Sequence, residues 1–215
     1  MGKDLKPMRC TVACQPTLLI ITGPQGSGCH LWSRLFAAHP AVYGWKDLLD
    51  KHWIGHKDEP FASCWKTPDL LENFDWNSHS FYTTSISCPY AIGGKHFIPD
   101  YAKFISNAKK YCDVKLAFLG RDKNILKEQQ VRVRKKHTTN LFFENTKDLM
   151  PDYFLSMELL HLYKEKYLLK VMRDLNFPVI MNYHDLYKDE NKKYIKHVKE
   201  FWLDKHVWDV SGYTN

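Results

Sequence analysis

The sequence predicts an α/β fold of three layers, with a central, mostly parallel sheet between two layers of helices. Two observations support this prediction. Short apolar segments rich in β-branched residues alternate with segments of helical periodicity, and a glycine-rich, P-loop-like turn joins the first strand to the first helix. Strands that alternate with helices pair in parallel, so we expect the ligand at the carboxyl ends of the strands.

The first strand is predicted over residues 17–22, an apolar run that ends at Gly23. Such a run is typical of a strand buried on both faces. The helix that follows the glycine-rich turn carries Leu31 and Leu35 at helical spacing, and it ends before Pro40 because the residue preceding a proline disfavours helical backbone. Together these segments predict a strand, a loop and a helix in direct succession.

Residues 41–80 form a stretch rich in tryptophan and interrupted by proline, with a short helical piece over 47–52. Two interpretations stay open for this stretch, a lid or substrate-side insertion and an ordinary packed connection. Trp45, Trp53 and Trp65 could line a pocket for a sugar or phenolic acceptor, although tryptophan in a domain of this size more often belongs to the core.

The remaining elements follow from the same signals. We find no internal repeat and treat residues 1–215 as a single domain. The long amphipathic helix carries two apolar groups, Leu155, Leu159 and Leu162, then Leu168, Met172 and Leu175. In chain order we predict a strand over 81–88, a helix over 100–111, a strand over 114–119, a basic helix over 123–136, the amphipathic helix over 152–175, a strand over 178–182 and a final helix over 191–203.

The composition excludes disordered and fibrous classes. Of the 215 residues, 44% are hydrophobic and 14% are aromatic, which is enough apolar material for a sizeable core. No apolar run approaches the ~18 residues of a membrane span, and no signal peptide precedes the first strand. The six cysteines are scattered, without metal-ligand spacing. We therefore expect a cytoplasmic protein with reduced thiols, no membrane span and no metal site.

Positive charge is concentrated in one window. The chain has a net charge of +7, and residues 103–136 hold eleven Lys or Arg against three acidic residues, a net +8. Such an excess favours an anionic partner. Residues 121–136 contain no aromatic side chain on which bases could stack, so we expect a small phosphorylated molecule and no nucleic acid.

The glycine-rich turn has the residues of an anion-binding loop. Glycines at 23, 26 and 28 permit positive φ and close backbone approach, so successive N–H groups can point at an anion on the helix N-terminus. In the triphosphate-binding loop GxxxxGK[ST], a lysine stands at the position of Cys29 and a magnesium-binding hydroxyl at that of His30. A kinase of the P-loop type would therefore lack two central groups.

Three segments resemble the sulfotransferase family. Residues 23–40 resemble its 5′-phosphosulfate-binding segment, which ends in His-Pro. Residues 118–123, with Arg121 and Asp122, resemble the Arg-Asp-Pro of its 3′-phosphate motif, and residues 179–186 resemble its late strand and Tyr-Glu-Asp-Leu turn. The resemblance implies transfer of a sulfuryl group from 3′-phosphoadenosine-5′-phosphosulfate to a hydroxyl or amine of a small molecule or sugar, without a metal.

The resemblance also implies the roles of individual residues. The 5′-phosphosulfate would contact the loop, and the 3′-phosphate would contact Arg121, assisted by Gln129 and one of Arg132 or Arg134. The family's catalytic lysine would fall on Gly26 or Gln25, its threonine on Cys29, its proline on Lys123 and its serine on Gln129. The loop residues implied in cofactor binding are Gln25, Gly26, Ser27, Gly28, Cys29 and His30.

An acceptor hydroxyl needs a base within hydrogen-bond reach. Asp47 lies eight residues beyond His39, where some family members carry a glutamate, and His96 follows the predicted strand over 81–88, near the position of the histidine that others use. Asp47 is slightly favoured, and His30 is a third candidate for a catalytic role. Lys46 or Lys95 would replace the missing lysine.

Two other functions stay open. One is a P-loop nucleotide or small-molecule kinase, against which the missing lysine argues. The other is a module that binds a nucleotide without turning it over, a function that the same missing lysine favours.

Overall fold

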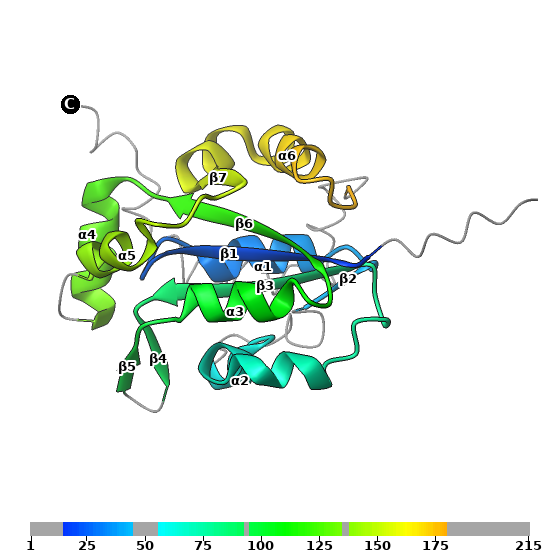
Figure 1. The fold of residues 1–215 in the computed structure, drawn as a ribbon. Coiled ribbons are helices and arrows are strands. Elements are labelled where there is room, and N and C mark those ends of the chain that lie inside the picture. The colour runs from blue at the N-terminus through cyan, green and yellow to red at the C-terminus, as the bar shows by residue number, and fades with distance from the viewer. Residues whose placement is uncertain (1–14, 45–55, 93–94, 135–137, 180–215) are drawn as a thin grey trace, which may run out of the picture.

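The computed structural model describes residues 15–44, 56–92, 95–134 and 138–179. Their strands form a five-stranded sheet in which all neighbouring strands are parallel, as predicted (Figure 1). The strands lie in the spatial order β2 (Val42–Tyr43), β3 (Phe81–Cys88), β1 (Thr17–Pro24), β6 (Asp113–Gly120) and β7 (Tyr153–Ser156).

Helices cover both faces of this sheet, which confirms the three-layer prediction. One face packs against α1 (Cys29–Ala37) and α6 (Met157–Asp174). The other packs against α2 (Ala62–Lys66), the 3-10 helix η3 (Pro68–Asn73), α3 (Tyr101–Ala108) and α5 (Thr139–Thr146). The other elements are α4 (Lys123–Arg134), the 3-10 helix η2 (His56–Asp58) and an antiparallel hairpin of β4 (Tyr90–Ile92) and β5 (Lys95–Phe97).

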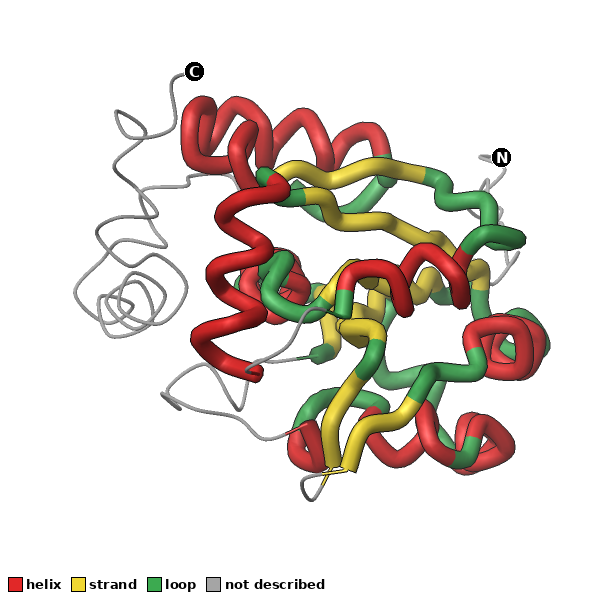
Figure 2. The backbone as a smooth tube through the Cα atoms, turned by 90° about the vertical axis from the view of Figure 1, so that its left-hand side faces the viewer, coloured by secondary structure: helices red, strands yellow, loops and turns green. Residues whose placement is uncertain are grey.

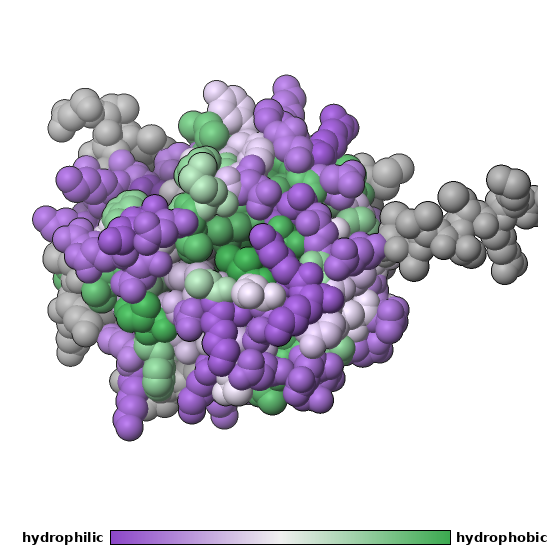
Figure 3. All heavy atoms as spheres, in the orientation of Figure 1, coloured by the Kyte–Doolittle hydropathy of each residue, from purple (hydrophilic) through white to green (hydrophobic). Residues whose placement is uncertain are grey.

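The central strand β1 is buried on both faces, as its apolar run predicts. Leu19 belongs to a core cluster that includes Trp32 of α1, while Ile20 belongs to the cluster on the opposite face. In that second cluster, Trp65 of α2 stacks on Phe104 of α3 with 3.7 Å between ring centroids. Hydrophilic side chains cover much of the outer surface that carries α3, with hydrophobic side chains visible between them (Figure 3).

The segment over residues 56–80 contributes several side chains to the core. Trp65 and Trp76 are both buried, and the indole N–H of Trp76 donates to the carbonyl of Leu71. These two tryptophans therefore serve packing, the more common role that the sequence suggested. Trp45, Trp53 and the helical piece over 47–52 lie outside the described residues.

The predicted helix over 152–175 is wrong at its start. Residues 153–156 form β7, because the backbone of this segment pairs with β6 and Asp152 bonds to both the N–H and the carbonyl of Leu116. The helix begins only after Ser156, whose side chain accepts from the N–H of Leu159. Its buried face consequently differs from the predicted one, with Leu159 39% and Leu162 66% exposed.

The sequence did not predict α5, the β4–β5 hairpin or the short strand β2. Each is short and depends on pairing or packing with distant residues. The predicted final helix and residues 180–182 of the last predicted strand lie outside the described part of the chain. Among the described helices, none combines the length and the apolar composition that crossing a membrane requires.

Candidate functional site

The glycine loop, residues 25–28, connects the carboxyl end of β1 to α1. Gly26 and Gly28 have φ of +86° and +102°, values that L side chains rarely adopt, so two of the three predicted positive φ angles are present. Gly23 has no such angle, but a Cβ there would lie 2.6 Å from Ser27 Oγ. A Cβ on Gly28 would lie 2.7 Å from Met157 Sδ. These glycines are required by conformation or by space.

The second predicted binding segment meets this loop directly. Arg121 follows the end of β6, the neighbour of β1 in the sheet, and its Nη1 donates to the carbonyl of Gly26 over 2.8 Å. Helix α4 lies beside the edge where β1 and β6 end (Figure 2). Gln129 of this helix is buried and packs against the loop. A Cβ added to Gly26 would lie 3.3 Å from the Cβ of Gln129. The structure thus brings together the loop, Arg121 and Gln129.

Gln130, which was not predicted as a site residue, also contacts the loop. Its Nε2 donates to the carbonyl of Gln25 over 2.9 Å, and its Oε1 accepts from the N–H of Thr138 over 3.0 Å and from the hydroxyl of Thr139 over 3.2 Å. The Thr138 hydroxyl in turn lies 3.3 Å from Gln25 Oε1. The buried Gln25 therefore fastens the loop to α4 through its backbone carbonyl and to the start of α5 through its side chain.

His161 belongs to α6, and the charge of Arg121 acts on its side chain. Burial, reinforced by the charges of Arg121 and Lys164, lowers the pKa of His161 to about 4. This imidazole is therefore neutral at pH 7. An anion bound beside Arg121 would offset the positive charges that depress this pKa.

Cys29 supplies no charge to the loop. It is the first residue of α1, and burial raises the pKa of its thiol to about 12. Its Sγ lies 3.4 Å from Ser27 Oγ. A neutral thiol therefore occupies the position at which triphosphate-binding loops carry a lysine.

A second cluster begins at His30. His30 Nε2 lies 2.9 Å and His56 Nδ1 lies 2.6 Å from the same oxygen, Oε1 of Glu59. Burial raises the pKa of Glu59, but the two histidines outweigh that effect and leave it below its usual value. Neither His56 nor Glu59 was predicted. The sequence offers one indication of this pair, a histidine and a glutamate three positions apart, and that spacing is too common to predict a site.

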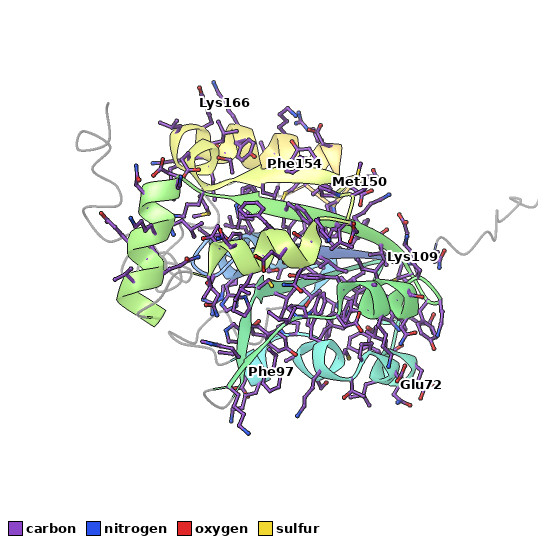
Figure 4. All side chains as sticks on the ribbon, turned by 60° about the vertical axis from the view of Figure 1, so that its left-hand side comes forward. Glu72, Phe97, Lys109, Met150, Phe154 and Lys166 are labelled. Atoms are coloured by element: carbon purple, nitrogen blue, oxygen red, sulfur yellow. The ribbon has the colours of Figure 1, made fainter. Side chains whose placement is uncertain are left out.

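The other candidates are less informative. His96 is exposed on β5, opposite Ala91. Phe97, its neighbour, marks this hairpin in Figure 4, at the opposite end of the molecule from Lys166 of α6. Lys95 is exposed on the same strand. The positions of Asp47 and Lys46, and the side chains of Arg132 and Arg134, lie outside the described residues.

A surface hollow lies at the other edge of the sheet, where β1 begins. It carries none of the predicted site residues, so we assign it no role. Its lining residues are Pro16, Pro40, Ala41, Trp76, Asn77, Ser78, His79 and Ser80.

No family model matches the sequence, and no curated protein matches it either. Among solved structures, the chain is similar to a sulfotransferase domain from the curacin biosynthetic pathway, with 13% identity over 83% of this chain and 80% of that chain and a TM-score of 0.49. It is also similar to the sulfotransferase domain of the Synechococcus PCC 7002 olefin synthase, with 12% identity over 98% and 87% of the two chains and a TM-score of 0.51. The second likeness shows that this chain has the fold of a sulfotransferase domain.

Proposed function

We propose that this chain, which has the sulfotransferase fold, binds 3′-phosphoadenosine-5′-phosphosulfate and transfers its sulfuryl group to a hydroxyl or amine of a small molecule or sugar. The observation that carries this proposal is the contact between Arg121 and the carbonyl of Gly26. This contact places the loop, which is suited to the 5′-phosphosulfate, next to the Arg121 guanidinium, which is suited to the 3′-phosphate. A ligand with phosphates at two positions of one nucleotide matches that arrangement.

The residues of the site fit such a donor. The left-handed glycines shape the turn before the N-terminus of α1, where N–H groups and the helix dipole favour an anion. Arg121 can contact a 3′-phosphate through two N–H groups. Gln129 can donate a further hydrogen bond.

Sulfuryl transfer requires alignment of the acceptor with the leaving group and donors where negative charge develops. The N–H of Ser27 already donates to the carbonyl of Pro24, so the other loop N–H groups supply the donors for the 5′-phosphosulfate, while Cys29 stays neutral. Of the predicted catalytic residues within the described part of the chain, His30 is the second residue after the loop and His96 lies exposed on the hairpin. His30 is therefore the nearer of these two to the sulfuryl group, to which its side chain can donate a hydrogen bond.

The neutral Cys29 also favours a second candidate function, a module that binds the nucleotide without turning it over. The two functions predict the same binding and differ in turnover. A transfer assay with the sulfated donor and a panel of phenols, amines and sugars distinguishes them through the release of adenosine 3′,5′-bisphosphate.

Binding is tested first by thermal shift with adenosine 3′,5′-bisphosphate, ATP with magnesium, and a short oligonucleotide. A ligand that binds the folded state raises Tm increasingly with its concentration. We expect this for the bisphosphate. Stabilisation by ATP and not by the bisphosphate would refute the proposal and favour a kinase.

The Arg121→Ala variant tests the second phosphate. It should lose the preference for adenosine 3′,5′-bisphosphate over the 5′-monophosphate by roughly 10- to 100-fold, since a charge-assisted hydrogen bond contributes about 1.5–3 kcal/mol. Lys127→Ala, which removes an exposed charge from α4, is the matched control. An unchanged preference in Arg121→Ala would show that this arginine does not contact the 3′-phosphate.

A further inference from the structure

Three side chains of metal-ligand type converge beside the glycine loop. His30 is the second residue of α1, His56 begins η2, and Glu59 follows η2. The imidazole and carboxylate ligand atoms of all three lie within 4.8 Å of one another. The side chains are 17%, 12% and 3% exposed, in the same order, so the cluster is largely shielded from water while both histidines retain an opening to solvent.

The contacts to Glu59 Oε1 within this cluster are short but do not have the angles of a hydrogen bond. Glu59 Oε1 lies 2.9 Å from His30 Nε2 and 2.6 Å from His56 Nδ1, yet among the described residues neither Glu59 Oε1 nor His56 Nδ1 has a partner in hydrogen-bond geometry. The two rings stand at 72° to each other, with centroids 5.4 Å apart. Buried polar atoms almost always have hydrogen bonds, and exceptions mark sites suited to an ion.

Charge gives an independent reason for a cation here. The Glu59 carboxylate is buried close to the N-terminus of α1, where the glycine loop is built to receive an anion. Two negative charges in this setting repel each other strongly, because the protein interior screens them less than water does. A cation held between Glu59 and the two histidines removes that repulsion.

We propose that His30, His56 and Glu59 bind a divalent transition-metal ion such as Zn²⁺. Two imidazoles and one carboxylate are a common ligand set for Zn²⁺ with an open fourth position, whereas Mg²⁺ and Ca²⁺ prefer sites made of oxygen ligands. Ligand atoms of a tetrahedral zinc site lie roughly 3.3 Å apart, given bonds of about 2.0–2.2 Å. To admit the ion, the distances of 2.9 Å and 2.6 Å from Glu59 Oε1 to the two histidines would have to lengthen by about 0.4 Å and about 0.7 Å.

The position of His30 gives this ion a place in the site. It is the position at which triphosphate-binding loops carry the hydroxyl that binds magnesium. An ion at His30 therefore lies beside the anion at the loop and brings the positive charge that the neutral Cys29 does not supply. The ligand geometry does not rest on the proposed function, whereas the charge argument does, because it needs an anion at the loop.

The test titrates the full chain with Co²⁺ and Zn²⁺ after treatment with a chelator, without nucleotide. We expect one Co²⁺ to bind per chain, with the weak visible bands of a Co²⁺ ion held by nitrogen and oxygen ligands. Zn²⁺ should displace this Co²⁺. His56→Ala and Glu59→Gln should each weaken binding by at least about tenfold, since even outer partners of metal ligands contribute 10- to 100-fold. His79→Ala, at the opposite edge of the sheet, should bind as the unchanged chain does.

Several results would overturn the metal site. They are absence of stoichiometric binding, unchanged affinity in both cluster variants, and an intense thiolate-to-cobalt band, which would place the ion on cysteines. The spectrum of the unchanged chain decides the ligand type even if a variant does not fold. Because nucleotide binding is measured separately by thermal shift, failure of the metal site and failure of the proposed function are distinguishable.

Discussion

Replacing Gln130 by alanine removes the side chain that fastens the glycine loop to α4. Gln130 is 1% exposed, and the substitution leaves two buried backbone groups without their bonds, the carbonyl of Gln25 and the N–H of Thr138. Each unsatisfied group costs about 1–3 kcal/mol. The free energy of unfolding should therefore fall by about 4 kcal/mol, which lowers Tm by roughly 8–16 °C in a chain of this size.

Urea unfolding followed by far-UV circular dichroism measures this loss. Gln130→Glu retains the acceptor for Thr138 but places a buried carboxylate oxygen against the carbonyl of Gln25, so it should lose at least as much stability as the alanine variant. Lys127→Ala, exposed on the same helix, should stay within about 0.5 kcal/mol. A loss below about 1 kcal/mol in Gln130→Ala would refute the reasoning, because the loop would then be held by other contacts.

Gly28→Ala should lower the free energy of unfolding by about 2–4 kcal/mol, from left-handed backbone strain and the crowding of Met157; urea unfolding that shows less than 1 kcal/mol would contradict the geometry. Burial raises the pKa of Cys29 to about 12 and that of Cys112 to about 12, so at pH 8 both thiols should resist alkylation in the folded chain and react in urea, as mapped by mass spectrometry. Fast labelling of the folded chain at either cysteine would show that it is not buried. Burial lowers the pKa of His161 to about 4, so the unfolded chain takes up a proton at this position before the folded chain does, and stability should fall as pH falls from about 6.5 toward 4. His161→Gln should lose less stability than the unchanged chain over that range. If urea unfolding at pH 7.5 and pH 5 shows the same loss of stability in both proteins, His161 is not the group responsible.

The sequence predicted the strand, loop and helix around the glycines correctly because each depends on near neighbours. An apolar run between polar segments indicates a buried strand, and glycines at 26 and 28 indicate positive φ before any partner is known. Parallel pairing also followed, since helices separate most of the long strands. These inferences needed no knowledge of distant contacts.

The sequence was less informative where packing decides. The periodicity of residues 152–175 suggested one helix, but pairing with β6 draws residues 153–156 into the sheet and moves the buried face away from Leu159 and Leu162. In α4, counting along the family motif selected Gln129. Gln130 bonds to the glycine loop only because the helix lies beside that loop in the folded chain.

The candidate site divides in the same way. The glycine loop and Arg121 could be recognised from their residues and order, because strand ends and tight turns are specified locally. The bond between Arg121 and Gly26 spans 95 residues, and the meeting of His30 with His56 and Glu59 joins two separate elements. Such contacts depend on how helices and strands pack across the sheet. Burial of the two core clusters decides that packing, and no short segment of the sequence specifies it.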